Sequence, residues 1–262
     1  MIDTHCHLEQ AVYDKDRENV IENCRQELDA VITCAPNPMH YEITLEMVDK
    51  HPNFIFAVLG IHPEYVKRFT EEQITQALQT IEKNKEKIVG IGEAGLDYDF
   101  IREKEWRIKQ QEMFANFIRL AKKMDLPLVV HIRNGPDKET ANAFEDAVEI
   151  LEREAAHRVQ LHMFGSRQLL QRVLDNGWYI STNAIVLRSK NYKKLVRDTP
   201  LERLMLETDA PWLHPSGDSK ARNDPTGVRA VAERVAQIKK TTFEDVDKIT
   251  TKNAIDFFRL KL

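Results

Sequence analysis

The sequence Met1-Ile2-Asp3-Thr4-His5-Cys6-His7 reads as a buried strand that ends in a His-x-His pair. Further apolar runs along the chain end in the same way, in residues of metal-binding chemistry. The residues at these later ends are His62, Glu93, His131, His162 and Asp209. In a (β/α)8 barrel the active site collects side chains from the C-terminal ends of eight parallel strands. We therefore predict an α/β fold, a TIM-like (β/α)8 barrel with a metal site at the C-terminal ends of its strands.

Strand-like and helix-like segments alternate along the chain, as such a barrel requires. We expect strands at residues 1–7, 30–34, 54–59, 88–91, 128–131, 159–162, 178–181 and 204–206. We expect helices at residues 16–28, 41–50, 70–81, 103–124, 140–154, 167–175, 191–197, 227–239 and 243–258. Nearly continuous apolar strands between helices are typical of a covered parallel sheet. An open doubly wound sheet is the alternative, but its glycine-rich phosphate-binding sequence does not follow the first strand.

Length and composition are typical of one soluble globular domain. The 262 residues match a single barrel of about 250 residues, so we expect one domain over residues 1–262. The net charge of −4 argues against a broad basic surface for duplex DNA. It does not exclude a phosphate substrate, because bound divalent cations reverse the local field.

The three cysteines, Cys6, Cys24 and Cys34, do not suggest a disulfide framework. The sequence shows no apolar run near the roughly 18 residues that a membrane span needs and no signal segment. We expect a cytoplasmic protein with no membrane association and no obligate protein partner.

Two carboxylates and four histidines form the candidate metal set. His5 and His7 alternate along a strand and therefore face the same way, while Cys6 faces the other. Glu93 and Asp209 each follow an uncharged apolar strand, where a carboxylate is costly unless it is paired or bound to metal. Six such ligands suit two divalent cations with one carboxylate bridging. Ligation rich in imidazole favours Zn, Mn, Co or Ni.

Four further residues are candidates for contacts to substrate or to ligands. His62, just past the third strand, can donate a hydrogen bond to substrate or orient a ligand, and a structural role in its loop is the alternative. Glu207 lies two residues before Asp209, where it can orient a ligand or hold a proton. Arg133 and Arg222 offer the planar fork that fits a phosphate, unless they belong to a solvated surface. Three aromatic residues near strand ends offer faces on which a base can stack: Tyr98, Phe164 and Trp212.

Six segments spread over nearly the whole chain carry a resemblance to a known family. They are Ile2–Leu8, Gly60–Pro63, Gly92–Tyr98, Pro127–Arg133, Glu207–Pro211 and Arg222–Pro225. In this order they resemble the motifs of the TatD family of metal-dependent deoxyribonucleases, within the amidohydrolase superfamily. The most specific are Gly-Glu-Ala-Gly-Leu-Asp-Tyr at 92–98 and Glu-Thr-Asp-Ala-Pro at 207–211.

The resemblance implies a metal-dependent hydrolase of DNA phosphodiesters that acts chiefly on single strands or ends. It implies six metal ligands: His5, His7, Glu93, His131, His162 and Asp209, with Glu93 bridging. We assign the first ion to His5, His7 and Asp209 and the second to His131 and His162. A hydroxide between the two ions would attack the phosphodiester, with Asp209 as the acceptor of its proton and Glu93 as the second catalytic residue. The family is usually assayed with Mg, so five metals stay open: Zn, Mn, Mg, Co and Ni.

Two segments depart from the family pattern. Met163-Phe164-Gly165-Ser166 replaces the usual Cys-Phe-Ser/Thr-Gly run after His162, and Asn134-Gly135 follows Arg133 where an acidic residue is usual. Both segments border the expected substrate mouth, so they bear on substrate preference more than on the hydrolytic chemistry. The alternative function is a hydrolase of small phosphoesters, lactones or amides on the same two-metal centre.

Overall fold

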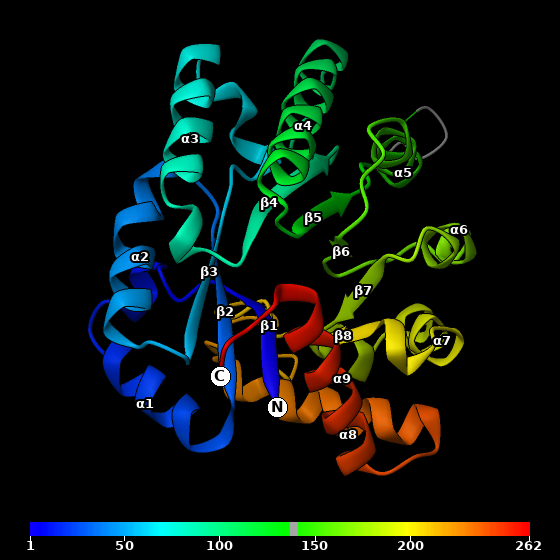
Figure 1. Cartoon of the computed structure of the whole chain (residues 1–262). Helices are drawn as coiled ribbons and strands as arrows, with labels where there is room; N and C mark the ends of the chain where they lie inside the picture. Colours follow the sequence, from blue (N-terminus) through cyan, green and yellow to red (C-terminus); the bar gives the residue numbers. More distant parts are fainter. Residues whose placement is uncertain (137–140) are drawn as a thin grey trace.

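Over residues 1–136 and 141–262, which the computed structural model describes, eight parallel strands form a nearly closed barrel (Figure 1). They are β1 Ile2–Cys6, β2 Ala30–Ala35, β3 Ile55–Leu59, β4 Gly90–Asp97, β5 Leu128–Arg133, β6 Val159–Leu161, β7 Tyr179–Thr182 and β8 Leu204–Leu206. Each strand pairs in parallel with the next one in the sequence. Just beyond β8, the Asp209 N–H donates to the carbonyl oxygen of His5, which brings the two ends of the sheet together. The predicted barrel is confirmed.

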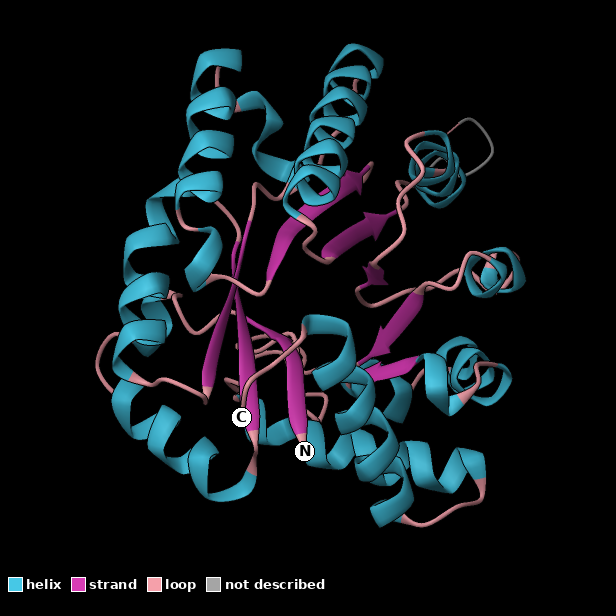
Figure 2. Ribbon diagram, in the orientation of Figure 1, coloured by secondary structure: helices cyan, strands magenta, loops and turns pink. Residues whose placement is uncertain are grey.

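Helices follow the strands and surround the barrel (Figure 2). They are α1 Arg17–Glu27, α2 Tyr41–Lys50, α3 Glu71–Lys83, α4 Lys104–Met124, α5 Ala143–Arg153, α6 Leu170–Asp175, α7 Lys190–Asp198, α8 Val228–Lys239 and α9 Phe243–Phe258. Short 3-10 helices span Ala11–Tyr13, Pro38–His40, Pro63–Lys67, Lys85–Lys87, Ala184–Leu187, Leu201–Arg203 and Pro225–Gly227. Residue 140, where we predicted a helix to begin, lies outside the described residues. Among the described helices, none combines the length and the apolar character that crossing a bilayer requires.

Apolar side chains fill the barrel core, and polar side chains occupy its C-terminal end. The larger cluster of buried side chains fills the space between the strands and the surrounding helices. A second cluster combines residues from five strands with the end of α9: Ile2, Ala30, Ile32, Cys34, Val58, Val129, Met205, Phe257 and Phe258. These residues of five different strands meet in the barrel interior, so the cluster fills the interior from the end packed by α9 up to Cys34, near the C-terminal end of β2. The C-terminal strand ends are therefore free to carry a site.

Strand β4 extends farther than the sequence indicated, because its glycines allow a close approach to β5. We predicted the strand to end at residue 91, but pairing with β5 continues through an irregularity to Asp97. Gly92 and Gly95 have φ values of +141° and +148°. A Cβ atom at Gly95 would lie 2.0 Å from the carbonyl oxygen of His131. Glu93 therefore lies inside the strand, at the irregularity, instead of just beyond its end.

Candidate metal centre

The six candidate ligands meet at the C-terminal end of the barrel. They come from within β1, β4 and β5 and from the residues just after β1, β6 and β8: His5, His7, Glu93, His131, His162 and Asp209. Their ligand atoms form overlapping groups of three in which all atoms lie within 4.8 Å of one another. The structure thus brings together residues that are up to about two hundred positions apart in the sequence.

The carboxylate of Glu93 lies between two pairs of imidazoles. Its Oε2 is 3.6 Å from His5 Nε2 and 3.5 Å from His7 Nε2. Its Oε1 is 3.0 Å from His131 Nδ1 and 3.6 Å from His162 Nε2. One oxygen therefore faces each pair, which is the arrangement that a carboxylate shared between two cations needs.

Asp209 lies on the His5 and His7 side of this centre. Its Oδ1 is 3.7 Å from His5 Nε2 and 3.5 Å from His7 Nε2. Its backbone has a φ of 59°, a left-handed conformation that aspartate tolerates better than most residues. The side chain of Asp209 is 16% exposed, more than that of the other five residues. Asp209 is therefore the ligand candidate with the most open access to solvent.

His5, in β1, and His7, just after it, are each contacted on the ring nitrogen that faces away from the centre. His7 Nδ1 lies 2.8 Å from the carbonyl oxygen of Cys34 and 3.3 Å from Glu9 Oε1. His5 Nδ1 lies 3.3 Å from the thiol sulfur of Cys34. Such outer contacts fix the tautomer and orientation of metal-binding histidines. The side chain of Cys34 is thus buried against the ring of His5.

Buried carboxylates stand behind the other two histidines. His131 Nε2 lies 2.9 Å from Asp97 Oδ2. His162 Nδ1 lies 3.1 Å from Glu207 Oε1, although the two atoms are poorly aligned for a hydrogen bond. Glu207 is itself held by the side chain of Asn183 and lies where an orienting residue was expected. Asp97 and Glu9 were not among the predicted site residues, although each is an acidic residue close in sequence to a ligand candidate.

His62 lies at the edge of the centre. Its Nε2 is 3.9 Å from Glu93 Oε1, and its ring centroid is 4.2 Å from that of His131. Its Nδ1 accepts the backbone N–H of Glu64, so in the neutral ring Nε2 carries the proton and faces the centre. Burial and the nearby His131 lower the pKa of His62 to about 3, which keeps the ring neutral.

The surrounding histidines also act on Glu93. Burial alone would raise the pKa of this carboxyl group, but the imidazoles of His5, His62 and His131 around it hold the pKa well below its ordinary value. Glu93 is therefore ionised, as a metal ligand must be.

Arg133 and Arg222 occupy different environments. The guanidinium of Arg133 is half exposed at the end of β5, 2.6 Å from Asp99 Oδ2, and lies over the ring of Phe100. Both NH groups of Arg222 bind the carboxylate of Asp16, at 2.8 and 2.6 Å. The Arg222 fork is thus occupied by a partner in the segment before α1, and Arg222 is not part of the group of six.

Two of the three aromatic stacking candidates are buried, which corrects our expectation. The Tyr98 hydroxyl donates to Asp146, and the Phe164 ring packs edge-to-face on Phe144. Neither ring has a face available to a base. Trp212 is 48% exposed, and its ring centroid is 5.1 Å from that of His7. Of the three candidates, only Trp212 can receive a base beside the centre.

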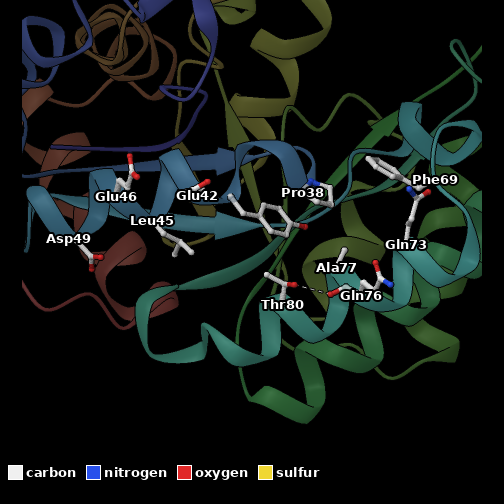
Figure 3. A pocket seen from close by; sticks show the side chains of 11 residues that line it. Pro38, Glu42, Leu45, Glu46, Asp49, Phe69, Gln73, Gln76, Ala77 and Thr80 are labelled. Atoms are coloured by element: carbon white, nitrogen blue, oxygen red, sulfur yellow. Dashed lines mark hydrogen bonds between the residues drawn. The ribbon is translucent and has the colours of Figure 1, made fainter.

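The groove in Figure 3 lies away from these residues, on the outer surface between α2 and α3. It encloses about 640 Å³, with apolar side chains such as Leu45 and Phe69 and with Glu42, Glu46 and Asp49 along α2. None of the six candidate ligands lines it. The candidate metal ligands therefore lie at the barrel mouth and not in this groove.

Comparisons with known proteins agree with this geometry. A family model described as TatD related DNase matches residues 2–259. The chain is 35% identical to the uncharacterized metal-dependent hydrolase YabD of Bacillus subtilis, and the match covers 99% of each protein. It is 30% identical to the human deoxyribonuclease TATDN3, with 98% of this chain and 94% of that protein covered.

Solved structures share the fold. A TatD homologue from Escherichia coli, YjjV, superposes with a TM-score of 0.87 at 24% identity and covers 100% of this chain and 98% of its own. A TatD family hydrolase from Entamoeba histolytica also gives a TM-score of 0.87, at 21% identity and with the same coverage. At these identities the likeness concerns the barrel alone.

Proposed function

Because the chain belongs to the TatD related DNase family and is a metal-dependent hydrolase, we propose that it cleaves phosphodiester bonds of DNA, in single strands or at frayed ends. We further propose that two divalent ions serve this reaction. The position of Glu93 carries the proposal, because its two oxygens face two separate pairs of imidazoles. Two-metal sites with a shared carboxylate are suited to the hydrolysis of phosphate esters.

The residues at the strand ends fit such ions. His5, His7 and Asp209 would hold the first ion and His131 and His162 the second, with Glu93 between them. Imidazole nitrogens and carboxylate oxygens suit Zn, Mn, Co or Ni, whereas Mg prefers a set of oxygen ligands. When bound, the ions would lower the pKa of a water molecule and polarise a phosphoryl oxygen.

The protein's own groups would handle protons and position the substrate. Asp209 is the most accessible carboxylate of the set, so it is placed to accept a proton from the attacking water and return it to the leaving oxygen. The Nε2–H of His62 faces the centre and would donate to a phosphoryl oxygen. Arg133 follows His131 by two residues on β5, so it shares the inward face of the strand and would bind a neighbouring phosphate.

Access to the strand ends favours unpaired DNA. A phosphodiester must reach a concave mouth, which an intact duplex cannot do without distortion. A single or frayed strand can enter, with a base stacked on the exposed ring of Trp212 beside His7. The net charge of −4 supplies no broad basic track for a duplex.

The test compares one labelled sequence as a single strand, a blunt duplex and a covalently closed circle, in the presence of Mn²⁺. RNA, bis-p-nitrophenyl phosphate and lactones complete the panel. We expect the single strand to be cut fastest. Glu93→Gln should lose both activity and bound metal, whereas Glu103→Gln, a surface control that pairs with Lys67, should keep both.

Three outcomes would contradict the proposal. Lactone turnover without DNA cleavage would favour a small-molecule hydrolase. Cleavage of the closed circle as fast as of the single strand would exclude the preference for unpaired DNA. Unchanged metal content in Glu93→Gln would exclude the shared carboxylate.

A further inference from the structure

Asp97 is a fully buried carboxylate outside the proposed ligand set. Its Oδ2 lies 2.9 Å from His131 Nε2, while Nδ1 of the same ring lies 3.0 Å from Glu93 Oε1. The His131 ring is therefore contacted by a carboxylate at each nitrogen. We infer that Asp97 is a positioning residue, which holds His131 with Nδ1 toward the centre and so sets the affinity of the ion that His131 and His162 share. This inference rests on the proposed two-metal function.

The distribution of hydrogen-bond donors supports this role. A neutral imidazole has one N–H and one lone pair, and an ionised carboxylate can only accept. Once Glu93 binds a cation, Asp97 is the carboxylate that remains to accept the proton of His131, so that proton lies on Nε2 and the lone pair of Nδ1 faces the cation. A carboxylate behind a metal-binding histidine orients the ring and raises its basicity.

Asp97 can hold the ring because its own carboxylate is fixed. Its Oδ1 accepts the backbone N–H groups of Asp99 at 3.0 Å and Phe100 at 2.9 Å. A rotation that released His131 would break both of these hydrogen bonds. The side-chain oxygen of Gln110 also accepts the backbone N–H of Asp97 at 3.0 Å, which fixes the backbone at this residue.

A third cation is the rival explanation, since His62, Asp97 and His131 form a compact group of potential ligands. Two contacts argue against it. The Nδ1 of His62 already accepts the Glu64 N–H, so its inward Nε2 carries a proton. Both oxygens of Asp97 are engaged, one by two backbone N–H groups and the other by His131.

The informative substitution is Asp97→Asn. Asparagine keeps the shape and one oxygen for the backbone N–H groups of residues 99 and 100. Its amide group would then face the Nε2–H of His131 with another donor, so the ring would lose its fixed orientation. Asp99→Asn is the matched control, because Asp99 lies on the same loop but contacts Arg133 instead of His131.

Binding of Mn²⁺ to metal-free protein gives a readout that does not depend on activity. We expect two ions in the wild type, with the electron paramagnetic resonance signal of a coupled pair. Asp97→Asn should bind the first ion unchanged and the second about 10- to 100-fold more weakly. Asp99→Asn should bind both Mn²⁺ ions with wild-type affinity. His131→Ala should reproduce the loss, and Asp97→Asn should add little to it in the double variant.

The other outcomes of the Mn²⁺ titration also test the role of Asp97. If Asp97→Asn still binds the first ion, its barrel is intact. Two ions of wild-type affinity in that variant would overturn the inference while leaving the proposed function standing. Three ions in the wild type and two in the variant would make Asp97 a ligand and also overturn it. Fewer than two ions in the wild type would instead defeat the proposed function. If Asp97→Asn does not fold, Asp97→Ser tests the same point, since its hydroxyl can still cap the loop but does not reach His131.

Discussion

The guanidinium of Arg133 is paired with the carboxylate of Asp99 at 2.6 Å. Arg133 ends β5, and Asp99 follows the end of β4, so the pair bridges neighbouring strand ends at the barrel mouth. The arginine that would bind a substrate phosphate is thus partly neutralised when no substrate is present. A phosphate has to compete with Asp99 for the same fork.

Replacing Arg133 by alanine should weaken the binding of DNA without removing metal. The change deletes a charge-assisted hydrogen bond worth about 1.5–3 kcal/mol and leaves the Asp99 carboxylate near the substrate with Arg102 as its remaining arginine partner. We expect KM for a single-stranded oligonucleotide to rise at least tenfold, with metal content measured by elemental analysis unchanged. Equal KM values for the two proteins would remove Arg133 from the substrate site.

Replacing Asp99 by asparagine should have the opposite effect. An exposed ion pair is worth about 0.2–1 kcal/mol, so releasing Arg133 should lower KM by up to about fivefold. The effect should shrink at high salt and disappear when Arg133 is already alanine. A higher KM in Asp99→Asn, with Arg133 present, would show that the pair positions the arginine for substrate instead of competing with it.

The sequence was sufficient to predict the barrel and the six converging side chains, because each of these residues stands at or near the end of a local apolar strand. The helical periodicity likewise located α2 and α9 with the bounds that the structure shows. These are local signals, and a parallel barrel brings all of its strand ends to one face.

Other features depended on contacts between distant segments. Glycines such as Gly92 and Gly95 usually indicate the end of a strand. Only their close packing against β5 shows why β4 continues past them. The pairing of Arg222 with Asp16 joins residues more than two hundred positions apart. The direction in which Tyr98 points is likewise set by its partner Asp146 on α5, which no local pattern reveals.

Replacing Trp212 by alanine should weaken the binding of single-stranded DNA. Stacking of a base on an aromatic side chain is worth about 1–3 kcal/mol, so we expect KM to rise from about five- to 150-fold. The cleavage of bis-p-nitrophenyl phosphate, which has no base, should change much less. Phe164→Leu is the control, because its buried ring cannot contact DNA. A loss of similar size on both substrates would mean that Trp212 acts through His7 and not through a base.

Replacing Gly95 by alanine should destabilise the barrel where it supports the centre. The added Cβ would lie 2.0 Å from the carbonyl oxygen of His131, and the φ of +148° is strained for alanine. Overpacking and backbone strain each cost about 1–3 kcal/mol, so we expect the free energy of unfolding to fall by about 2–6 kcal/mol. Urea denaturation of the metal-free protein measures this change.

Gly177→Ala separates the cost of backbone strain from the cost of overpacking. Gly177 has a φ of +72°, but no neighbouring atom lies within 4 Å of the added Cβ. It should cost only about 1–2 kcal/mol, the penalty of a left-handed backbone. Any Gly95→Ala protein that folds should also bind Mn²⁺ more weakly, since the strands that carry Glu93 and His131 must move apart. Equal stabilities of the two variants would show that β4 and β5 separate without cost, and that their close approach does not hold the centre together.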